Sequence, residues 1–216
     1  MLIVYGAHGS PFVRKVLVTL AEKKIPYEIE VTIPLNANED YKKIHPMGKI
    51  PALRDGDKVI PDSSAICAYL EKTHPAPSLY PSDPYDYARA LWFEEYGDTA
   101  LAQVIGGKIF FPKILAPMFF KRAVDEAAIE KAVTDDLPPL FNYLEGQIRD
   151  GRPIVGSEFS IGDISLASEL VNLKLSGFGV DAKRWPKLAA FVERVHARPS
   201  FQELMEKEKK TFGGEI

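Results

Sequence analysis

The sequence predicts a small α/β domain followed by a larger all-α domain. Over the first eighty residues, short apolar runs alternate with segments of helical periodicity. Residues 74–84 then contain four prolines, a density that is typical of a linker. Beyond this linker nearly every segment repeats its apolar residues at helical spacing. We therefore expect one domain over residues 1–78 and a second over residues 84–216.

Two strands joined by a helix open the first domain. Residues 2–5 form a continuous apolar run, which predicts a strand buried on both faces. After a short loop, apolar residues recur at helical spacing up to Lys24. Residues 27–31 alternate in polarity and predict a second strand. A helical crossover returns the chain in the same direction, so we expect the two strands to be parallel.

The remainder of the first domain is expected to contain a short helix, a hairpin and a final helix. The polar stretch 36–43 indicates the short helix. Residues 51–54 and 58–60 flank Asp55-Gly56-Asp57, which is a favourable hairpin turn. Apolar residues at helical spacing predict the last helix over residues 63–72.

The second domain is expected to be built from helices alone. Helical periodicity covers residues 85–97, 126–149, 163–175, 186–197 and 201–210. In residues 106–118, Pro112 and Pro117 interrupt an apolar run. This segment is therefore open to three interpretations: a kinked helix, two helices or a loop.

Composition limits the classes of function. Of 216 residues, 46% are hydrophobic and 26% charged, as in an ordinary globular protein rather than a disordered chain. No run of eighteen apolar residues predicts a transmembrane helix, and the N-terminus does not resemble a secretory signal. The net charge of −3 offers no basic surplus for nucleic acid or an anionic membrane. Cys67 is the single cysteine, so we expect a soluble cytoplasmic protein without an intrachain disulfide.

Three short motifs could carry chemistry. Ser10 precedes Pro11 at a predicted helix start, where unpaired amides favour an anion and a hydroxyl adds a donor. The alternative is that Ser10 only caps the helix. Pro51 stands at the entry to a strand, and its peptide bond with Ile50 is open to either isomer. Asp62 and Ser63 open another helix, as caps or as a carboxylate and hydroxyl that could hold an amino-acid group.

In order and spacing, these motifs resemble the soluble glutathione S-transferases. The resemblance extends over nearly the whole chain, through the proline linker and the helical second half. It includes Ser160 and Asp163, which look like the family's capping box, with Asp in place of the usual Glu or Gln. It implies a thioredoxin-like N-terminal domain that binds glutathione and an all-helical C-terminal domain that contributes the pocket for an electrophile.

The resemblance also implies a role for each candidate residue. Ser10 would donate a hydrogen bond to the glutathione sulfur and so lower its pKa, as in a serine-type class. The backbone of Ile50, before the cis-proline Pro51, would pair with the cysteinyl backbone of glutathione. Asp62 would lie near the γ-glutamyl ammonium and Ser63 on its carboxylate, although the family commonly has Glu or Gln where Asp62 stands. Lys49 would meet the glycyl carboxylate.

Tyr5 is the alternative catalytic residue, because some classes of the family use a tyrosine at the end of the first strand. We favour Ser10, which adjoins a helix start, whereas Tyr5 would have to reach across a loop. Cys67 lies inside a helical pattern, where a thiol behaves as a small hydrophobic group.

In the second domain Tyr96, Phe110, Phe111 and Phe119 could line the electrophile pocket, but such aromatic sets are more often core. His45 and His196 are most simply surface or packing residues, and the four histidines show no metal-binding spacing.

The leading hypothesis is a glutathione transferase that activates the glutathione thiolate for attack on hydrophobic electrophiles, with a detoxifying role. Glutathione would be a co-substrate, with no other cofactor and no metal, and the family implies a homodimer. One alternative is a non-catalytic protein that binds glutathione or hydrophobic ligands on the same fold. Another is a glutathione-dependent reductase, peroxidase or isomerase. The serine at position 10 argues against a glutaredoxin-like mechanism, which needs a protein thiol.

Overall fold

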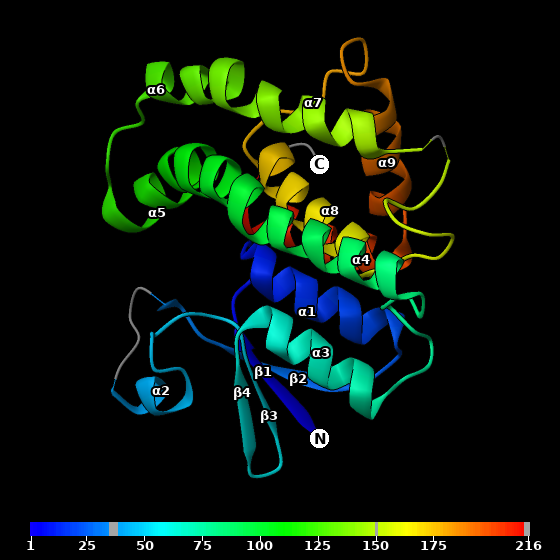
Figure 1. Cartoon of the computed structure of the whole chain (residues 1–216). Helices are drawn as coiled ribbons and strands as arrows, with labels where there is room; N and C mark the ends of the chain where they lie inside the picture. The colour runs from blue at the N-terminus through cyan, green and yellow to red at the C-terminus, as the bar shows by residue number, and fades with distance from the viewer. Residues whose placement is uncertain (35–38, 150, 214–216) are drawn as a thin grey trace. The chain divides into compact units, whose positions relative to one another are not determined.

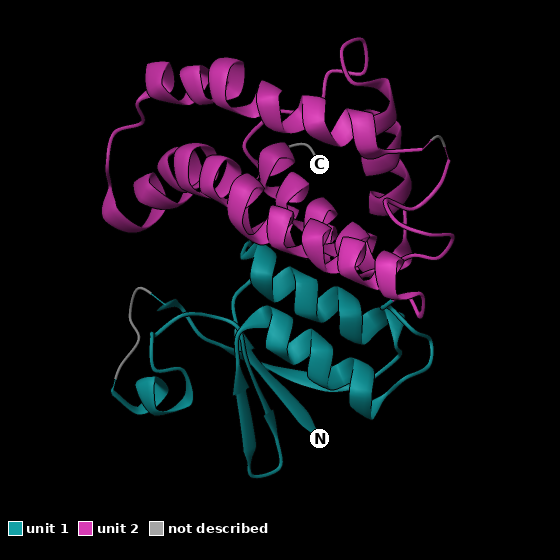
Figure 2. Cartoon of the chain, in the orientation of Figure 1, with its two compact units in different colours: residues 1–80 teal, residues 81–216 magenta. Residues whose placement is uncertain are grey.

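The computed structural model of the chain describes residues 1–34, 39–149 and 151–213. The chain divides into two units, Met1–Tyr80 and Pro81–Ile216, which are coloured separately in Figure 2. The first unit contains a four-stranded sheet with helices, and the elements described in the second unit are all helical. The predicted order of an α/β domain followed by an all-α domain is therefore confirmed.

The sheet of the first unit is mixed. Its strands are β1 (Leu2–Gly6), β2 (Tyr27–Val31), β3 (Ala52–Asp55) and β4 (Lys58–Pro61). They lie in the order β2-β1-β3-β4, with β1 parallel to β2 and antiparallel to β3. The β3–β4 hairpin turns at Gly56, whose φ of 57° lies in the left-handed region that glycine enters without steric cost. All four predicted strands are present, and β1 and β2 are parallel as expected.

Helices α1 (Pro11–Glu22) and α3 (Ser63–Thr73) run side by side along one face of the sheet (Figure 1). A Cβ added to Gly6 would come within 2.7 Å of Val13, so Gly6 faces α1. Because side chains alternate along a strand, the neighbouring Tyr5 points to the opposite face. There it packs with Tyr41 of α2 (Glu39–Ile44). Residues 36–38 of the short helix predicted over 36–43 lie outside the described residues.

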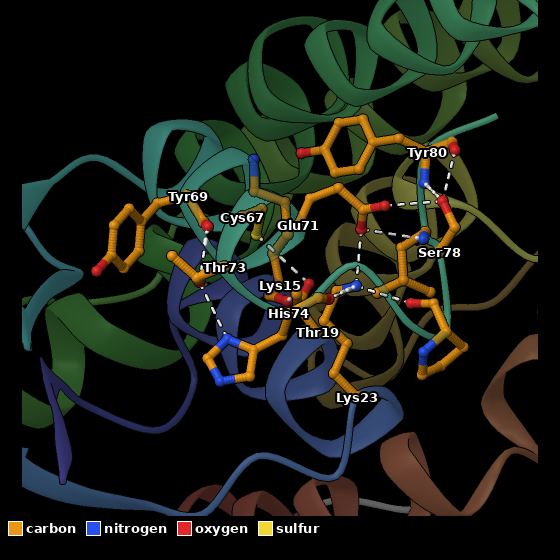
Figure 3. Close-up of polar contacts among 12 residues, drawn as sticks. Lys15, Thr19, Lys23, Cys67, Tyr69, Glu71, Thr73, His74, Ser78 and Tyr80 are labelled. Carbon is orange, nitrogen blue, oxygen red and sulfur yellow. Dashed lines mark hydrogen bonds and ion pairs between the residues drawn. The ribbon is translucent and has the colours of Figure 1, made fainter. Parts of the chain in front are cut away.

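A buried lysine joins the C-terminal ends of α1 and α3 (Figure 3). The ammonium of Lys23 donates to the carbonyls of His74 at 2.8 Å and Pro77 at 2.7 Å. It also lies 2.7 Å from the carboxylate of Glu71, which accepts from the Ser78 hydroxyl at 2.7 Å. A buried ammonium needs such compensation, so these contacts fix the chain that leaves α3. Farther along the same helices, Cys67 is fully buried beside Thr19, as expected for a packing thiol.

The second unit begins with an unbroken helical run over residues 84–120. It comprises α4 (Pro84–Tyr96), η2 (Gly97–Leu115) and α5 (Ala116–Phe120). The η2 stretch has the wider π winding, in which the amide of Ala116 bonds to the carbonyl of Phe111, five residues back. Of the three interpretations left open for residues 106–118, the structure selects a continuous helical path through Pro112.

Further helices follow in the described part of the second unit. They are α6 (Glu126–Lys131), η3 (Ala132–Asp136), α7 (Leu137–Gln147), α8 (Ile161–Leu175), α9 (Pro186–His196) and α10 (Pro199–Phe212). Helix α8 is buried along nearly its whole length and contacts α4, η2, α9 and α10. The helix predicted over residues 126–149 is present as a continuous helical run over residues 126–147, with the wider π winding in η3.

One part of the 84–120 run is apolar enough to cross a membrane by length and composition. The relevant 18-residue window has a mean hydropathy of 1.2, and a third of it is buried inside the protein. The sequence criterion of eighteen consecutive apolar residues did not detect it, because polar residues interrupt the window. Leu101, Ile105 and Ile109 of this run are fully buried.

The predicted capping box at the start of α8 is present. Asp163 is completely buried, and its carboxylate accepts from the amides of Ile154 at 2.8 Å and Ser160 at 2.9 Å. The Ser160 hydroxyl donates to the same carboxylate at 3.0 Å. Desolvation raises the pKa of Asp163 to about 6, although these hydrogen bonds favour the ionised form. Asp163 therefore connects the start of α8 to the loop before it at the cost of burying a carboxylate.

Candidate functional site

The sheet register brings the three sequence motifs to one end of the first unit. Tyr5 of β1 is paired with Ala52 of β3, and Ala52 is paired with Pro61 of β4. The chain leaves β1 toward Ser10, enters β3 through Ile50-Pro51 and leaves β4 toward Asp62-Ser63. Because β1 and β4 both run antiparallel to β3, these three segments meet at the same edge.

Ser10 caps α1 and is half-buried at its N-terminus. Its backbone is extended, with φ −80° and ψ 120°, and its hydroxyl oxygen accepts from the amide of Val13 at 3.4 Å. Pro11 occupies the first helical turn, where its missing N–H costs nothing. The hydroxyl oxygen of Ser10 therefore caps the helix, as one of the two interpretations expected. The hydroxyl proton takes no part in that bond and can be donated to an anion at the positive end of the helix dipole.

The Ile50–Pro51 peptide bond is cis. Pro51 is buried directly before β3, whereas Ile50 is half-buried and Lys49 is exposed. The hydroxyl of Tyr41 in α2 donates to the carbonyl of Lys49 at 2.7 Å. Helix α2 therefore fixes the backbone just ahead of the cis bond.

Asp62 is the N-cap of α3. One of its carboxylate oxygens, Oδ1, accepts from the amides of Ser64 at 3.0 Å and Ala65 at 3.1 Å. Its φ of 78° is uncommon for a residue other than glycine. Asp62 is exposed and Ser63 is buried, so the carboxylate faces solvent while Ser63 contributes mainly its helix-start backbone.

Tyr5 does not share this arrangement. It lies on the sheet face opposite α1, is only 5% exposed, and accepts a hydrogen bond from Nε of Arg54 at 2.8 Å. Its ring lies 6.1 Å from that of Tyr41, and the two belong to one core cluster with Ala52. The structure therefore separates Tyr5 from the start of α1 more completely than the loop between them suggested.

Two residues near the site were missed or underestimated. The side chain of Lys15 is buried, and its ammonium donates to the Ser64 hydroxyl at 2.9 Å, which links α1 to the first turn of α3. Nothing in the sequence marks it, because lysines are ordinarily exposed. His45 is 3% exposed and follows α2, so the packing interpretation given to it holds. Its position only four residues before Lys49 was the signal that could have associated it with the site.

The aromatic candidates of the second unit have different environments. Phe110 is a core residue packed edge-on against Phe212, and Phe119 is exposed. The Tyr96 hydroxyl donates to the carbonyl of Leu140 at 3.3 Å, and burial raises its pKa to about 12. Phe111 is half-buried, and its ring lies 6.2 Å from that of Phe120. Among residues 1–34, 39–149 and 151–213, no three His, Cys, Asp or Glu side chains gather where they could hold a metal ion.

Family models match both units. The model of the glutathione S-transferase N-terminal domain matches residues 4–78, and that of the C-terminal domain matches residues 110–208. The chain belongs to the glutathione S-transferase family, as its motifs indicated. It is a glutathione transferase, an enzyme of a family that binds glutathione and electrophilic substrates.

Individual relatives agree with this assignment. The chain is 32% identical to a probable cytosolic glutathione S-transferase DHAR1 of Oryza sativa subsp. japonica, over 88% of this chain and 81% of the relative. It is 27% identical to glutathione S-transferase GstB of Escherichia coli K12, over 95% and 98% of the two chains. A solved glutathione S-transferase from Rhodospirillum rubrum F11 superposes with a TM-score of 0.86 at 29% identity, covering 94% of this chain and 91% of the other. These similarities confirm the thioredoxin-like N-terminal fold with a helical C-terminal domain.

Proposed function

We propose that this enzyme is a serine-type glutathione transferase, in which Ser10 stabilises the glutathione thiolate for attack on a hydrophobic electrophile. The main support is the place of Ser10 at the N-terminus of α1, on the sheet edge where the chain also enters β3 and leaves β4. Tyr5, the alternative residue, lies on the other face with its oxygen bonded to Arg54.

The chemistry follows from which form of the thiol is stabilised. A hydroxyl that donates to sulfur favours the thiolate over the thiol and lowers the pKa of the thiol from about 8.5. The N-terminal end of the α1 dipole acts in the same direction. Ser10 is not a general base, because its own proton is too weakly acidic. The rate would increase through the larger thiolate fraction and through holding both reactants in position.

Backbone groups and charged side chains of the first unit would bind the remaining parts of glutathione. The Ile50 backbone, which directly precedes Pro51 and β3, would pair with the cysteinyl residue as an added strand does. The exposed ammonium of Lys49 would meet the glycyl carboxylate. The start of α3 at Ser63 would receive the γ-glutamyl carboxylate, since amides at a helix N-terminus bind anions. Asp62 would face the γ-glutamyl ammonium.

The Asp62 role can be separated from helix capping. In Asp62→Asn the side-chain oxygen can still accept from Ser64 and Ala65, but the negative charge is lost. We expect KM for glutathione to rise about 3- to 10-fold with little change in kcat, as for loss of a solvent-facing charge contact. Steady-state kinetics with varied glutathione measure this. An unchanged KM would restrict Asp62 to capping.

The proposal also covers the oligomeric state of the enzyme, its location in the cell and its physiological role. We infer a homodimer, supported by exposed apolar side chains on α4, namely Tyr85, Leu91 and Trp92. A cytoplasmic location is supported by the rice relative, whose name includes the word cytosolic. A detoxifying role would follow from the proposed attack on hydrophobic electrophiles.

Titration of the enzyme-bound glutathione thiol tests the mechanism directly. Thiolate absorbance of the complex should give a pKa clearly below about 8.5, and the complex should turn over with an aromatic halide such as 1-chloro-2,4-dinitrobenzene. Binding with an unshifted thiol and no turnover of any electrophile would favour the non-catalytic carrier. Turnover of a disulfide or peroxide alone would favour the reductase alternative.

Tyr5→Phe separates the two candidate hydroxyls. Because the Tyr5 oxygen accepts from Arg54 on the opposite face, its removal should leave the pKa of bound thiol within about 0.3 units of the parent. The lost hydrogen bond should lower the free energy of unfolding by about 1 kcal/mol. Thiolate titration and urea unfolding of the same preparation measure both effects. A thiol pKa that returns to its free value in this variant would transfer the catalytic role to Tyr5.

A further inference from the structure

His45 terminates the α2 segment that leads into the proposed glutathione site. Its amide donates to the carbonyl of Tyr41 at 2.8 Å, and its own carbonyl accepts from the amide of Gly48 at 2.7 Å. The turn formed in this way delivers the chain to Lys49 and Ile50. The backbone of His45 is therefore part of the connection between α2 and the residues proposed to bind glutathione.

The imidazole of His45 is enclosed within this connection. Its ring stacks on Tyr41, with centroids 6.5 Å apart and planes at 26°, and the residue is 3% exposed. In the described part of the chain, its Nδ1 is buried and has no hydrogen-bond partner. Tyr41 in turn donates to the carbonyl of Lys49. Tyr41 thus links the His45 ring, on which it stacks, to the backbone carbonyl of Lys49.

This environment accepts a neutral ring better than a charged one. Burial is the largest effect and lowers the pKa of His45 from its usual 6.5. The charge of Asp62 and a backbone hydrogen bond oppose the shift, and Lys49 reinforces it. Burial raises the pKa of the stacked Tyr41 to about 12, so that ring stays neutral. The other charges of α2 are exposed and paired with one another, Lys42 with Glu39 and Lys43 with Asp40.

We propose that His45 is a positioning residue, which holds the segment 48–50 in its glutathione-binding conformation while the imidazole is neutral and releases it on protonation. An imidazolium donates from both ring nitrogens, and among the described residues Nδ1 meets no acceptor at normal hydrogen-bond geometry. Protonation would therefore open the turn toward water. This inference rests on the proposed binding of glutathione by Lys49 and Ile50.

The proposal predicts an affinity for the glutathione backbone that falls in acid. We would measure the Kd of S-methylglutathione by calorimetry from pH 5 to pH 7.5, because this ligand has no titrating thiol. The parent should bind about 3- to 10-fold more weakly at pH 5 than at pH 7. His45→Asn cannot be protonated, and its Kd should change less than about 1.5-fold over the same range. His74→Asn, which alters an exposed histidine at the end of α3, should behave as the parent does.

NMR titration of His45 in the parent protein gives a second readout, which does not depend on the folding of any variant. By linkage, saturating S-methylglutathione should lower the pKa of His45 further, as followed by the C2 proton of its ring in NMR. A parent Kd that is constant with pH, an equal acid loss in His45→Asn, or a His45 pKa unmoved by ligand would each overturn the inference. Absence of S-methylglutathione binding at every pH would instead count against the proposed glutathione site.

Discussion

Replacing Ser10 by Ala is expected to raise the pKa of the bound glutathione thiol by about one to two units. A hydrogen bond to a charged group contributes about 1.5–3 kcal/mol, and each pKa unit corresponds to about 1.4 kcal/mol. If the pKa returns to about 8.5, the thiolate fraction near pH 6.5 should fall about 10- to 50-fold, and kcat/KM with it. Thiolate absorbance and turnover of 1-chloro-2,4-dinitrobenzene measure the two quantities on one preparation.

Ser10 also caps α1, so loss of the hydroxyl must be separated from loss of the cap. Ser10→Ala should cost about 1 kcal/mol of stability through the cap, whereas Ser10→Gly should cost only a few tenths. Both remove the donor to sulfur and should raise the thiol pKa equally. Ser10→Thr keeps a hydroxyl and should restore much of the shift. If the thiol pKa followed helix stability instead of the hydroxyl, Ser10 would be only a cap.

The strand segments of the first unit were predictable because local patterns determine them. Apolar run, alternation and turn chemistry gave all four strands, and the Asp55-Gly56-Asp57 turn lies where the hairpin was expected. The meeting of Ser10, Ile50 and Asp62 depends on strand order instead. Only the family resemblance implied that order, because local periodicity does not determine which strands pair.

The side chains around the site were harder to predict. Whether the Tyr5 side chain lies on the same side of the sheet as Ser10 depends on which face of β1 packs against α1. The close approach of Gly6 to Val13 shows that Gly6 faces α1 and that Tyr5 faces away from it. Lys15 is buried against the usual preference of its residue type, because its ammonium donates to the Ser64 hydroxyl of α3. Such contacts join residues far apart in the sequence, and a single sequence carries no signal for them.

The second unit shows a related limit. Pro112 suggested an interruption, since proline removes an amide from the helical ladder. The π winding of η2 uses bonds to the fifth residue back, and the helix passes through Pro112 without ending. In this region η2 packs mainly against α8. Helical content was thus predictable, whereas helix boundaries were not.

Asp163→Ala is expected to lower the free energy of unfolding by about 3 kcal/mol at pH 7. The change leaves the buried amides of Ile154 and Ser160 without their acceptor, and each unsatisfied donor costs about 1–3 kcal/mol. Relief of the buried carboxylate offsets part of the loss. Asp125→Ala removes an exposed cap of α6 in the same unit and should cost only about 1 kcal/mol. Urea unfolding at pH 7 compares the two variants, and equal losses would mean that the Asp163 contacts add nothing beyond capping.

The same carboxylate should make stability depend on pH in a defined direction. Burial raises the pKa of Asp163 to about 6 from its usual 3.8, so the folded state binds this proton more tightly than the unfolded state. Its contribution to stability is complete below about pH 4 and is lost as pH rises through about 6. Asp163→Asn does not titrate, so the parent should exceed it in stability by about 1–3 kcal/mol more at pH 4.5 than at pH 7.5. An unchanged difference would show that the three hydrogen bonds outweigh desolvation, and that Asp163 remains ionised throughout this range.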